Sequence, residues 1–335
     1  MKENIIRWGV LSTAEIAQEQ MIPAIQKVNN ASVLAIASNS NKEIDVAKKF
    51  QIPKTYNTYE ALLKDPEIDA VYIPLPNGLH ANWSKEAAKH GKHILCEKPA
   101  ALSEQEAQEV FKVCNEFNVQ YMEALMYQFH PQHQRVKDII ASGEIGEMKL
   151  IRANFSFLLE QLEGNIRMDR SLGGGSLYDI GCYCIHIIRY ITNSEPIKCY
   201  SISKIHEHFN VDMSVVGMME LENGLPAYFD CAMDMPSRHM YEVVGTKGTI
   251  KVNKAFITQD DGQGEIIVQN HRGKNRQEII NGDSYANGIE HYSNCIINNT
   301  IPIHSTEDTI KNMRAIDAFL KTIDSGNIVE VKQNS

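Results

Sequence analysis

The sequence predicts an α/β protein of two domains: a doubly wound parallel sheet, then an α+β domain with a large, mostly antiparallel open sheet. The chain has 335 residues, a length that one hydrophobic core rarely serves. Apolar runs alternate with helical patterns over residues 1–125, which is typical of parallel strands joined by right-handed crossovers. Beyond that point strand-like segments dominate. We therefore expect one domain over 1–125 and a second over 126–335.

The first domain is predicted as a regular alternation of strands and helices. Short apolar runs predict strands over 5–11, 32–37, 70–73, 93–96 and 119–124. Helical periodicity predicts helices over 14–28, 42–50, 81–90 and 103–117. Ser103 and Glu106 form a capping box that opens the last of these helices.

The second domain is expected to assemble around its strands. Its predicted elements are a helix over 131–143, a strand over 148–157, a glycine-rich segment with a helix, strands across 198–280, and helices over 285–298 and 307–323. Turns are expected at Asn223-Gly224 and Lys247-Gly248. Such an open sheet would leave one face uncovered within a single chain, so we expect a homodimer or homotetramer formed through it.

Composition excludes several classes of function. The net charge of −9 argues against a nucleic-acid binder, which normally presents a basic face. No apolar run approaches the roughly 20 residues that span a bilayer, and the N-terminus lacks the apolar block of a signal peptide. The seven cysteines are scattered and odd in number, which suits reduced thiols in the cytoplasm. We expect a cytoplasmic protein without membrane or nucleic-acid partners.

The segment from Gly173 to Tyr190 predicts one wall of an active site. At a helical period, Asp179, Tyr183, His186 and Tyr190 share one face, while the opposite face is apolar. The three glycines that precede this helix are expected to leave backbone room for a ligand at its N-terminal end. A carboxylate, a phenol and an imidazole on one face of a helix are poorly explained by packing alone.

The first strand-to-helix turn is a weak dinucleotide motif. Ser12, Ala14 and Ala17 stand where the fingerprint has glycines, and small side chains meet its spatial demands only in part. We expect Ser12, Thr13, Ala14 and Ile16 to contact the cofactor. A plain structural turn is the alternative.

The segments after the next three strands carry further polar candidates. Ser38, Asn39 and Lys42 follow the second strand without a carboxylate before Glu43, which favours a 2′-phosphate and hence NADP over NAD; an ordinary polar loop is the alternative. Asn77 and His80 are expected beneath the cofactor ring, with Pro74 and Leu75 as further cofactor contacts, unless this is only a structural loop. Glu97 and Lys98 end the strand at 93–96, where a lone lysine is most often a surface charge.

Together these residues resemble the glucose–fructose oxidoreductase / inositol dehydrogenase / MocA family of NAD(P)-dependent oxidoreductases. The likeness covers nearly the whole chain. Its markers are Trp8-Gly9, Asn77 with His80, Glu97-Lys98-Pro99, the Gly173–Tyr183 pattern and the segment from Glu123 to Pro131. The resemblance implies an N-terminal Rossmann domain, dimers or tetramers, and Glu97 and Pro99 shaping the cofactor side.

The resemblance also implies roles for three side chains. Lys98 and Tyr183 would form the proton-handling pair, and Asp179 would hold substrate hydroxyls. Inositol-dehydrogenase-like members carry His and Asp at the positions of Tyr183 and His186, so this chain is similar to the dihydrodiol, xylose and glucose–fructose branch.

The chemistry of these groups is consistent with hydride transfer between nicotinamide C4 and a hydroxyl or keto carbon of a sugar, polyol or vicinal diol. A tyrosine with a pKa of about 10 is a poor base, but an ammonium within about 4–6 Å lowers that pKa. His186 is expected to contact substrate, extend the relay or serve a structural role. Arg167 and Asp169 are expected at the substrate mouth, with a surface ion pair between them as the alternative.

Two further predictions complete the interpretation. The histidine pairs 130/133 and 206/208 lack a third ligand at suitable spacing, so we expect no metal. A catalytically silent NADP(H)-binding regulator of the same fold is the alternative function. The missing fingerprint glycines favour it, as does Gln128, which stands where related sequences often carry Arg; the presence of both Lys98 and Tyr183 argues against it.

Overall fold

The computed structural model describes residues 5–258 and 261–332 and divides the chain into two compact units. The first unit holds the described residues up to Met126 together with Tyr285–Ile310. The second unit holds Tyr127–Ser284 and the described residues from Lys311 onward. Within these ranges no helix has the length and apolar character needed to cross a membrane. The seven cysteines all lie in the described part, where they are buried and form no disulfide.

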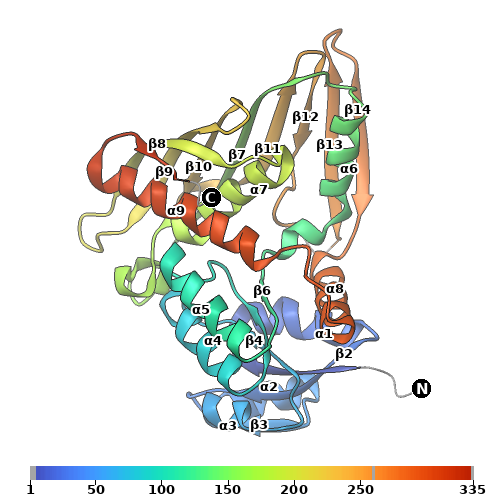
Figure 1. The fold of residues 1–335 in the computed structure, drawn as a ribbon, viewed down its shortest axis with the longest axis vertical. Helices are drawn as coiled ribbons and strands as arrows, with labels where there is room; N and C mark the ends of the chain where they lie inside the picture. Colours follow the sequence, from blue (N-terminus) through green and yellow to red (C-terminus); the bar gives the residue numbers. More distant parts are fainter. Residues whose placement is uncertain (1–4, 259–260, 333–335) are drawn as a thin grey trace. The chain divides into compact units, whose positions relative to one another are not determined.

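The N-terminal unit contains a six-stranded parallel sheet of order β3-β2-β1-β4-β5-β6, as the alternation of apolar runs and helices predicts (Figure 1). Its strands are β1 (Ile6–Leu11), β2 (Ala31–Ala37), β3 (Lys54–Tyr56), β4 (Ala70–Ile73), β5 (His93–Cys96) and β6 (Tyr121–Glu123). Its principal helices are α1 (Ile22–Lys27), α2 (Glu43–Phe50), α3 (Tyr59–Leu63), α4 (His80–Lys89) and α5 (Glu104–Glu116). As predicted, the Ser103 side chain caps α5 by accepting the Glu106 N–H.

Two short elements of this unit were not predicted, and one helix is irregular. β3 and α3 span too few residues for a periodic pattern. The helix predicted over 14–28 starts at Glu15 with a π-helical stretch, η1 (Ala17–Met21), before α1. The pattern shows where this helix lies, but not its change of hydrogen bonding.

Helix α8 (Ser284–Asn298) packs on the parallel sheet, although we expected it in the second domain. The Tyr292 hydroxyl donates to the carbonyl oxygen of Ile94 at 2.8 Å, and its ring lies 6.0 Å from that of Trp8. The Asn30 side chain donates to Asn294 at 2.8 Å. These contacts explain why residues 285–310 belong to the N-terminal unit, so the boundaries 1–125 and 126–335 describe the order of the chain better than its packing.

The C-terminal unit contains a nine-stranded sheet of order β14-β13-β12-β11-β7-β10-β9-β8-β15. Neighbouring strands are antiparallel except β7 and β10, which run parallel. The strands are β7 (Met148–Leu158), β8 (Pro196–Ile205), β9 (Asp212–Leu221), β10 (Pro226–Ala232), β11 (Asp234–Gly245), β12 (Gly248–Val252), β13 (Gln263–Asn270), β14 (Asn275–Asn281) and β15 (Val329–Glu330).

Helices cover one face of this sheet. They are α6 (Pro131–Ala141), α7 (Cys182–Thr192) and the part of α9 (Thr306–Ser325) that lies in this unit (Figure 1). The rings of Phe319 on α9 and Phe229 on β10 lie 4.9 Å apart, and the hydroxyls of Thr322 and Ser201 are hydrogen-bonded. The inward-facing side chains of β7, β9 and β10 are buried, whereas outward ones such as Met218 are exposed. Alternation at a period of two produces this contrast.

Candidate active site

The turn after β1 holds Ser12 in a backbone conformation that glycine usually adopts. Its φ is 141°, and its hydroxyl accepts a hydrogen bond from the Ala14 N–H at 3.1 Å. Ser12, Thr13, Ala14 and Ile16 are all partly exposed. A helix begins at Glu15, so the N–H groups at the N-terminal end of this helix lie next to this partly exposed turn.

The turn after β2 separates structural from exposed polar groups. Ser38 is buried, and its hydroxyl contacts the Ser40 hydroxyl at 2.8 Å and accepts the Ser40 N–H. Asn39 and Lys42 are exposed. Ser38 therefore shapes the turn, while Asn39 and Lys42 are accessible to a ligand.

His80 links two loops instead of facing a ligand. Its ring is fully buried, with Nδ1 at 2.7 Å from the carbonyl oxygen of Pro99 and Nε2 at 2.7 Å from that of Leu75. Burial lowers the pKa of this imidazole. Pro74 is also buried, whereas Asn77 is partly exposed. We expected His80 beneath the cofactor ring; its contacts give it a supporting role.

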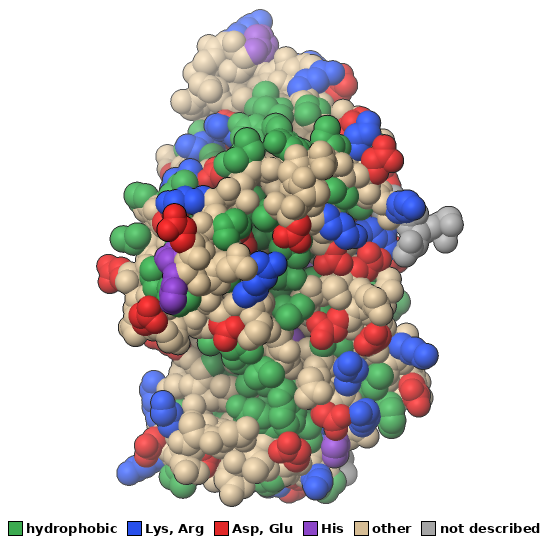
Figure 2. Space-filling model, turned by 90° about the vertical axis from the view of Figure 1, so that its left-hand side faces the viewer, with side chains coloured by type: hydrophobic (Ala, Val, Ile, Leu, Met, Phe, Trp, Pro, Cys, Tyr) green, Lys and Arg blue, Asp and Glu red, His purple; other side chains and the backbone are tan. Residues whose placement is uncertain are grey.

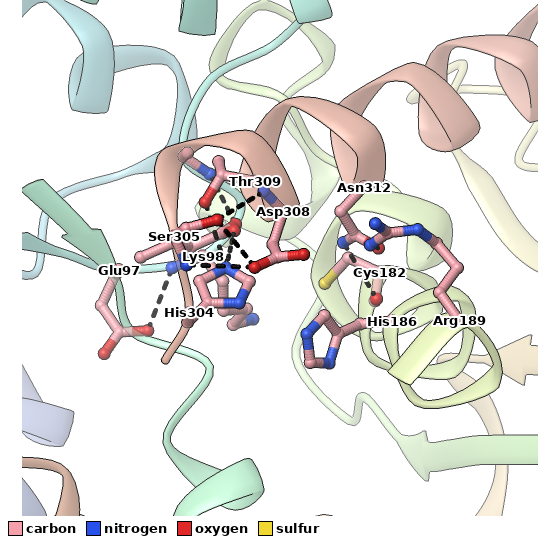
Figure 3. A network of polar contacts seen from close by, with 12 residues as sticks. Glu97, Lys98, Cys182, His186, Arg189, His304, Ser305, Asp308, Thr309 and Asn312 are labelled. Carbon is pink, nitrogen blue, oxygen red and sulfur yellow. Dashed lines mark hydrogen bonds and ion pairs between the residues drawn. The ribbon is translucent and has the colours of Figure 1, made fainter. Parts of the chain in front are cut away.

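Glu97, which precedes Lys98 just after β5, is held by a hydrogen bond from a tyrosine. The buried Tyr72 hydroxyl donates to Glu97 Oε1 at 2.6 Å. Burial raises the pKa of the Glu97 carboxyl, and burial together with the nearby Glu97 raises the pKa of Tyr72. Lys98 is partly exposed and lies among His304, Ser305 and Asp308 of the same unit (Figure 3).

The predicted cofactor residues fit a dinucleotide. They follow β1, β2, β4 and β5, which are parallel members of one sheet, so the carboxyl ends of these strands share one edge. The partly exposed turn after β1, the accessible Asn39 and Lys42, and the absence of a carboxylate over residues 38–42 suit a phosphorylated ligand.

The space beside the glycine-rich segment is already filled, which corrects our expectation of room for a ligand. A Cβ at Gly175 would lie 2.1 Å from Asp212 Oδ1, and one at Gly174 would lie 2.5 Å from the Arg167 carbonyl oxygen. The N–H groups of Gly174 and Gly175 bond to the carbonyls of Asp169 and Arg167. The glycines are thus required for close packing of the chain on itself.

Asp212 caps the helix that carries the candidate residues. Its Oδ2 accepts the Ser176 hydroxyl and the Leu177 N–H, each at 2.7 Å. Burial raises the pKa of the Asp212 carboxyl to about 6. The helix opens with a π-helical stretch, η6 (Leu177–Gly181), which continues into α7.

Asp179, within this π-helical stretch, is oriented by an arginine. Arg167 Nε donates to Asp179 Oδ2 at 2.7 Å, and the two side chains are 40% and 12% exposed. The expected alternative, a pair between Arg167 and Asp169, does not form; Asp169 instead accepts the Ser171 N–H and hydroxyl. Arg167 and Asp179 therefore act as a unit.

Tyr183 belongs to an aromatic cluster. Its ring centroid lies 5.4 Å from Phe155, 5.5 Å from Phe256 and 5.6 Å from Tyr127. It remains partly exposed, whereas residues 184–189 of the same helix are buried. The predicted apolar stripe is buried, as expected.

His186 contacts this cluster through Tyr127. It is 3% exposed, and its Nδ1 is 2.5 Å from the buried Tyr127 hydroxyl, whose pKa burial raises far above the ordinary value. On its other side its ring stacks with Tyr190, over which the Lys137 ammonium lies at 3.2 Å. Of its three expected roles, these contacts support the structural one.

Sequence reasoning missed several residues that shape the site. They are Tyr72, Glu123, Tyr127, Asp212 and His304. Tyr72 and Tyr127 lie in apolar runs and give no signal, and the partners of Asp212 and His304 are distant in the chain. No group of three or more potential metal-binding side chains occurs in the described part of the chain.

Two family models match the two parts of the chain. An oxidoreductase family with an NAD-binding Rossmann fold matches residues 6–125, and the GFO/IDH/MocA C-terminal domain matches residues 133–251. D-xylose 1-dehydrogenase (NADP(+)) 2 of Haloferax volcanii is 34% identical over 324 residues, which cover 97% of this chain and 99% of that protein. Trans-1,2-dihydrobenzene-1,2-diol dehydrogenase of Xenopus tropicalis is 28% identical over 331 residues, which cover 95% and 98%.

A solved structure has the same fold over almost the full length. It is a tyrosine-to-phenylalanine variant of KijD10, a 3-ketoreductase from Actinomadura kijaniata, in complex with TDP-benzene and NADP. The TM-score is 0.91 at 28% identity, covering 96% of this chain and 98% of that one. With both family models and a relative of full length in agreement, the chain belongs to the GFO/IDH/MocA family of oxidoreductases.

Proposed function

We propose that this protein is an NADP-preferring oxidoreductase acting on a hydroxyl or keto carbon of a sugar, polyol or vicinal diol. Its relatives include a xylose dehydrogenase named for NADP(+), a dihydrodiol dehydrogenase and a 3-ketoreductase solved with NADP. The bound cofactor would supply the hydride acceptor or donor. Ser12, Thr13 and Ala14 would contact its phosphates, and Asn39 and Lys42 its 2′-phosphate.

Tyr183 and Lys98 would handle the proton. In alcohol oxidation the Tyr183 phenolate accepts the hydroxyl proton, and in reduction the phenol returns it to the alkoxide oxygen. The Lys98 ammonium would lower the pKa of Tyr183 and stabilise the alkoxide. Asp179, held by Arg167, would accept hydrogen bonds from neighbouring substrate hydroxyls. The proposal requires both Lys98 and Tyr183 to reach one substrate oxygen when the ligands are bound.

One observation carries this assignment. Tyr183 is partly exposed although residues 184–189 after it are buried, and the Asp179–Arg167 pair lies one turn before it. Packing alone does not require a phenol that leaves the core at this position. Solved variants of KijD10 include one that changes a tyrosine and one that changes a lysine, the residue types proposed here.

Turnover of NADP with aldoses, inosose and vicinal diols tests the activity through absorbance of the reduced nicotinamide. Tyr183→Phe should lower kcat by about 10²–10⁴-fold with unchanged NADPH affinity, and Lys98→Met should move activity to higher pH. Full activity in both variants would refute the proton-handling roles. A folded parent that binds NADPH tightly yet turns over none of these substrates would instead be the silent regulator.

Cofactor preference has a test of its own. We expect Lys42→Glu to weaken NADPH binding by about tenfold or more, because a carboxylate would then face the 2′-phosphate. NADH affinity should change little. Fluorescence titration measures both, with Lys48→Glu in the last turn of the same helix as the matched control. Equal NADPH affinity in the parent and in Lys42→Glu would remove Lys42 from the cofactor site.

We also propose that the chain forms a homodimer or homotetramer through the open face of the nine-stranded sheet. Neighbouring strands bring an outward-facing row into register, made of Tyr200, Met218, Tyr228, Arg152 and Glu242. Beside it, Ile202 and Val216 are 65% and 49% exposed. Hydrophobic side chains also lie among charged ones on the side of the molecule drawn in Figure 2. A second copy would bury this mixed apolar and polar face.

A further inference from the structure

The peptide that follows Lys98 is held by two buried side chains. The carbonyl oxygen of Pro99 lies 2.7 Å from His80 Nδ1. The N–H of the next residue, Ala100, donates to Glu123 Oε1 at 3.0 Å. His80 and Glu123 are 0% and 1% exposed. These hydrogen bonds fix the backbone immediately after Lys98. They therefore also restrict the position of the Lys98 Cα atom, from which its side chain extends.

Glu123 is itself oriented from a distant part of the chain. Its Oε2 lies 3.0 Å from Nε2 of His304, which precedes α9 and is also 1% exposed. His304 Nε2 further contacts the Thr309 hydroxyl at 3.1 Å (Figure 3). Both carboxylate oxygens of Glu123 are therefore engaged, one by the Lys98 segment and one by His304.

Packing alone accounts poorly for this carboxylate. Burial of a charged group costs several kcal/mol unless partners compensate, and an apolar residue would fill the same volume more cheaply. Here one partner of the carboxylate is the backbone two residues after Lys98. The neighbouring carboxyl, Glu97, is held separately by Tyr72.

We infer that Glu123 is a positioning residue for Lys98, acting through the Ala100 N–H and oriented by His304. This inference rests on the proposed function, in which the Lys98 ammonium lowers the pKa of Tyr183. Coulombic attraction weakens with distance, so a displaced ammonium lowers that pKa less. Loss of Glu123 should therefore shift the pH dependence of alcohol oxidation without abolishing the reaction.

The test compares the pH profiles of kcat for Glu123→Leu and Glu123→Gln at saturating NADP. Leucine fills the volume but cannot accept the Ala100 N–H, so its profile should move up by about half to one pH unit, with kcat at neutral pH about tenfold lower. Glutamine keeps an acceptor oxygen and should restore most of kcat. NADPH affinity should stay at the parental value in both.

Glu106→Gln is the matched control, because Glu106 accepts the Leu102 N–H at 2.8 Å in the same loop but farther from Lys98. It should leave the pH profile unchanged. A parental profile in folded Glu123→Leu overturns the inference. If that variant does not fold, the pH profile of His304→Ala is measured instead. A smaller upward shift of this profile supports the inference, and a parental profile overturns it. An inactive parent would instead contradict the proposed function itself.

Discussion

Ser12 replaces a fingerprint glycine and still adopts a glycine-like backbone. Its φ of 141° lies in the region that side chains with a Cβ rarely occupy, and its hydroxyl accepts the Ala14 N–H. A short polar side chain thus stabilises locally what glycine permits sterically. The departure from the motif that favoured a regulator therefore does not preclude the turn geometry that a dinucleotide requires.

We expect Ser12→Val to lower the free energy of unfolding by about 1–3 kcal/mol, because a β-branched side chain fits this conformation poorly and makes no such hydrogen bond. Ser12→Gly should stay within about 1 kcal/mol of the parent. Thermal melts of the ligand-free protein measure both, and Thr13→Val is the control at the next residue. A Ser12→Val variant that melts with the parent would show that this backbone is not strained.

The roles of single residues were only partly predictable. The markers from Trp8-Gly9 to the Gly173–Tyr183 pattern, taken together and in order, predicted the family, which both family models confirm. Sequence did not predict that His80 would be buried between two carbonyls or that Arg167 would pair with Asp179. Such partnerships depend on long-range packing, which local periodicity does not encode.

Among the elements, the helix from Leu177 depends on a cap that lies outside it. Asp212, at the start of β9, accepts two hydrogen bonds at the N-terminal end of this helix and occupies the space beside Gly175. The helix was predictable because its apolar stripe is long and regular. Its cap was not, since Asp212 lies on a strand some 35 residues away, and its π-helical opening was not, since the apolar pattern does not reveal a change of hydrogen bonding.

The raised pKa of Asp212 makes the stability of this element depend on pH. A carboxyl whose pKa is about 6 when folded and 3.8 when unfolded binds its proton more tightly in the folded state. Its contribution is therefore most favourable at low pH, and up to about 3 kcal/mol is lost as pH rises from about 4 to about 6.

Asp212→Asn should remove this loss. The difference in unfolding free energy between the parent and the variant, measured by urea titration at each pH, should shift against the parent as pH rises from 4 to 6. Asp169→Asn should leave the difference almost constant over this range, because the Ser171 hydrogen bonds lower the pKa of Asp169 and its titration therefore falls below about pH 4. A difference for Asp212→Asn that does not change with pH would contradict the raised pKa.

For the molecule as a whole, the uncovered sheet face predicts its assembly. Met218 belongs to the outward row and is 52% exposed. A lysine at this position would be costly to bury in the interface between two copies. We expect Met218→Lys to shift the mass measured by light scattering from oligomer to monomer. Ile301→Lys alters a more exposed residue of the N-terminal unit, which does not contain this sheet, and should leave the mass unchanged. A parent that is already monomeric at micromolar concentration would refute the proposed interface.

Both units are discontinuous along the chain. The parallel sheet acquires α8 only from residues 285–298, and the nine-stranded sheet receives its last strand, β15, only at residues 329–330. A ribosome that has released the first 284 residues has therefore completed neither hydrophobic core. We expect the nascent chain to expose apolar surface until residues 285–330 have been synthesised, which makes it a natural client for chaperones that bind growing polypeptides.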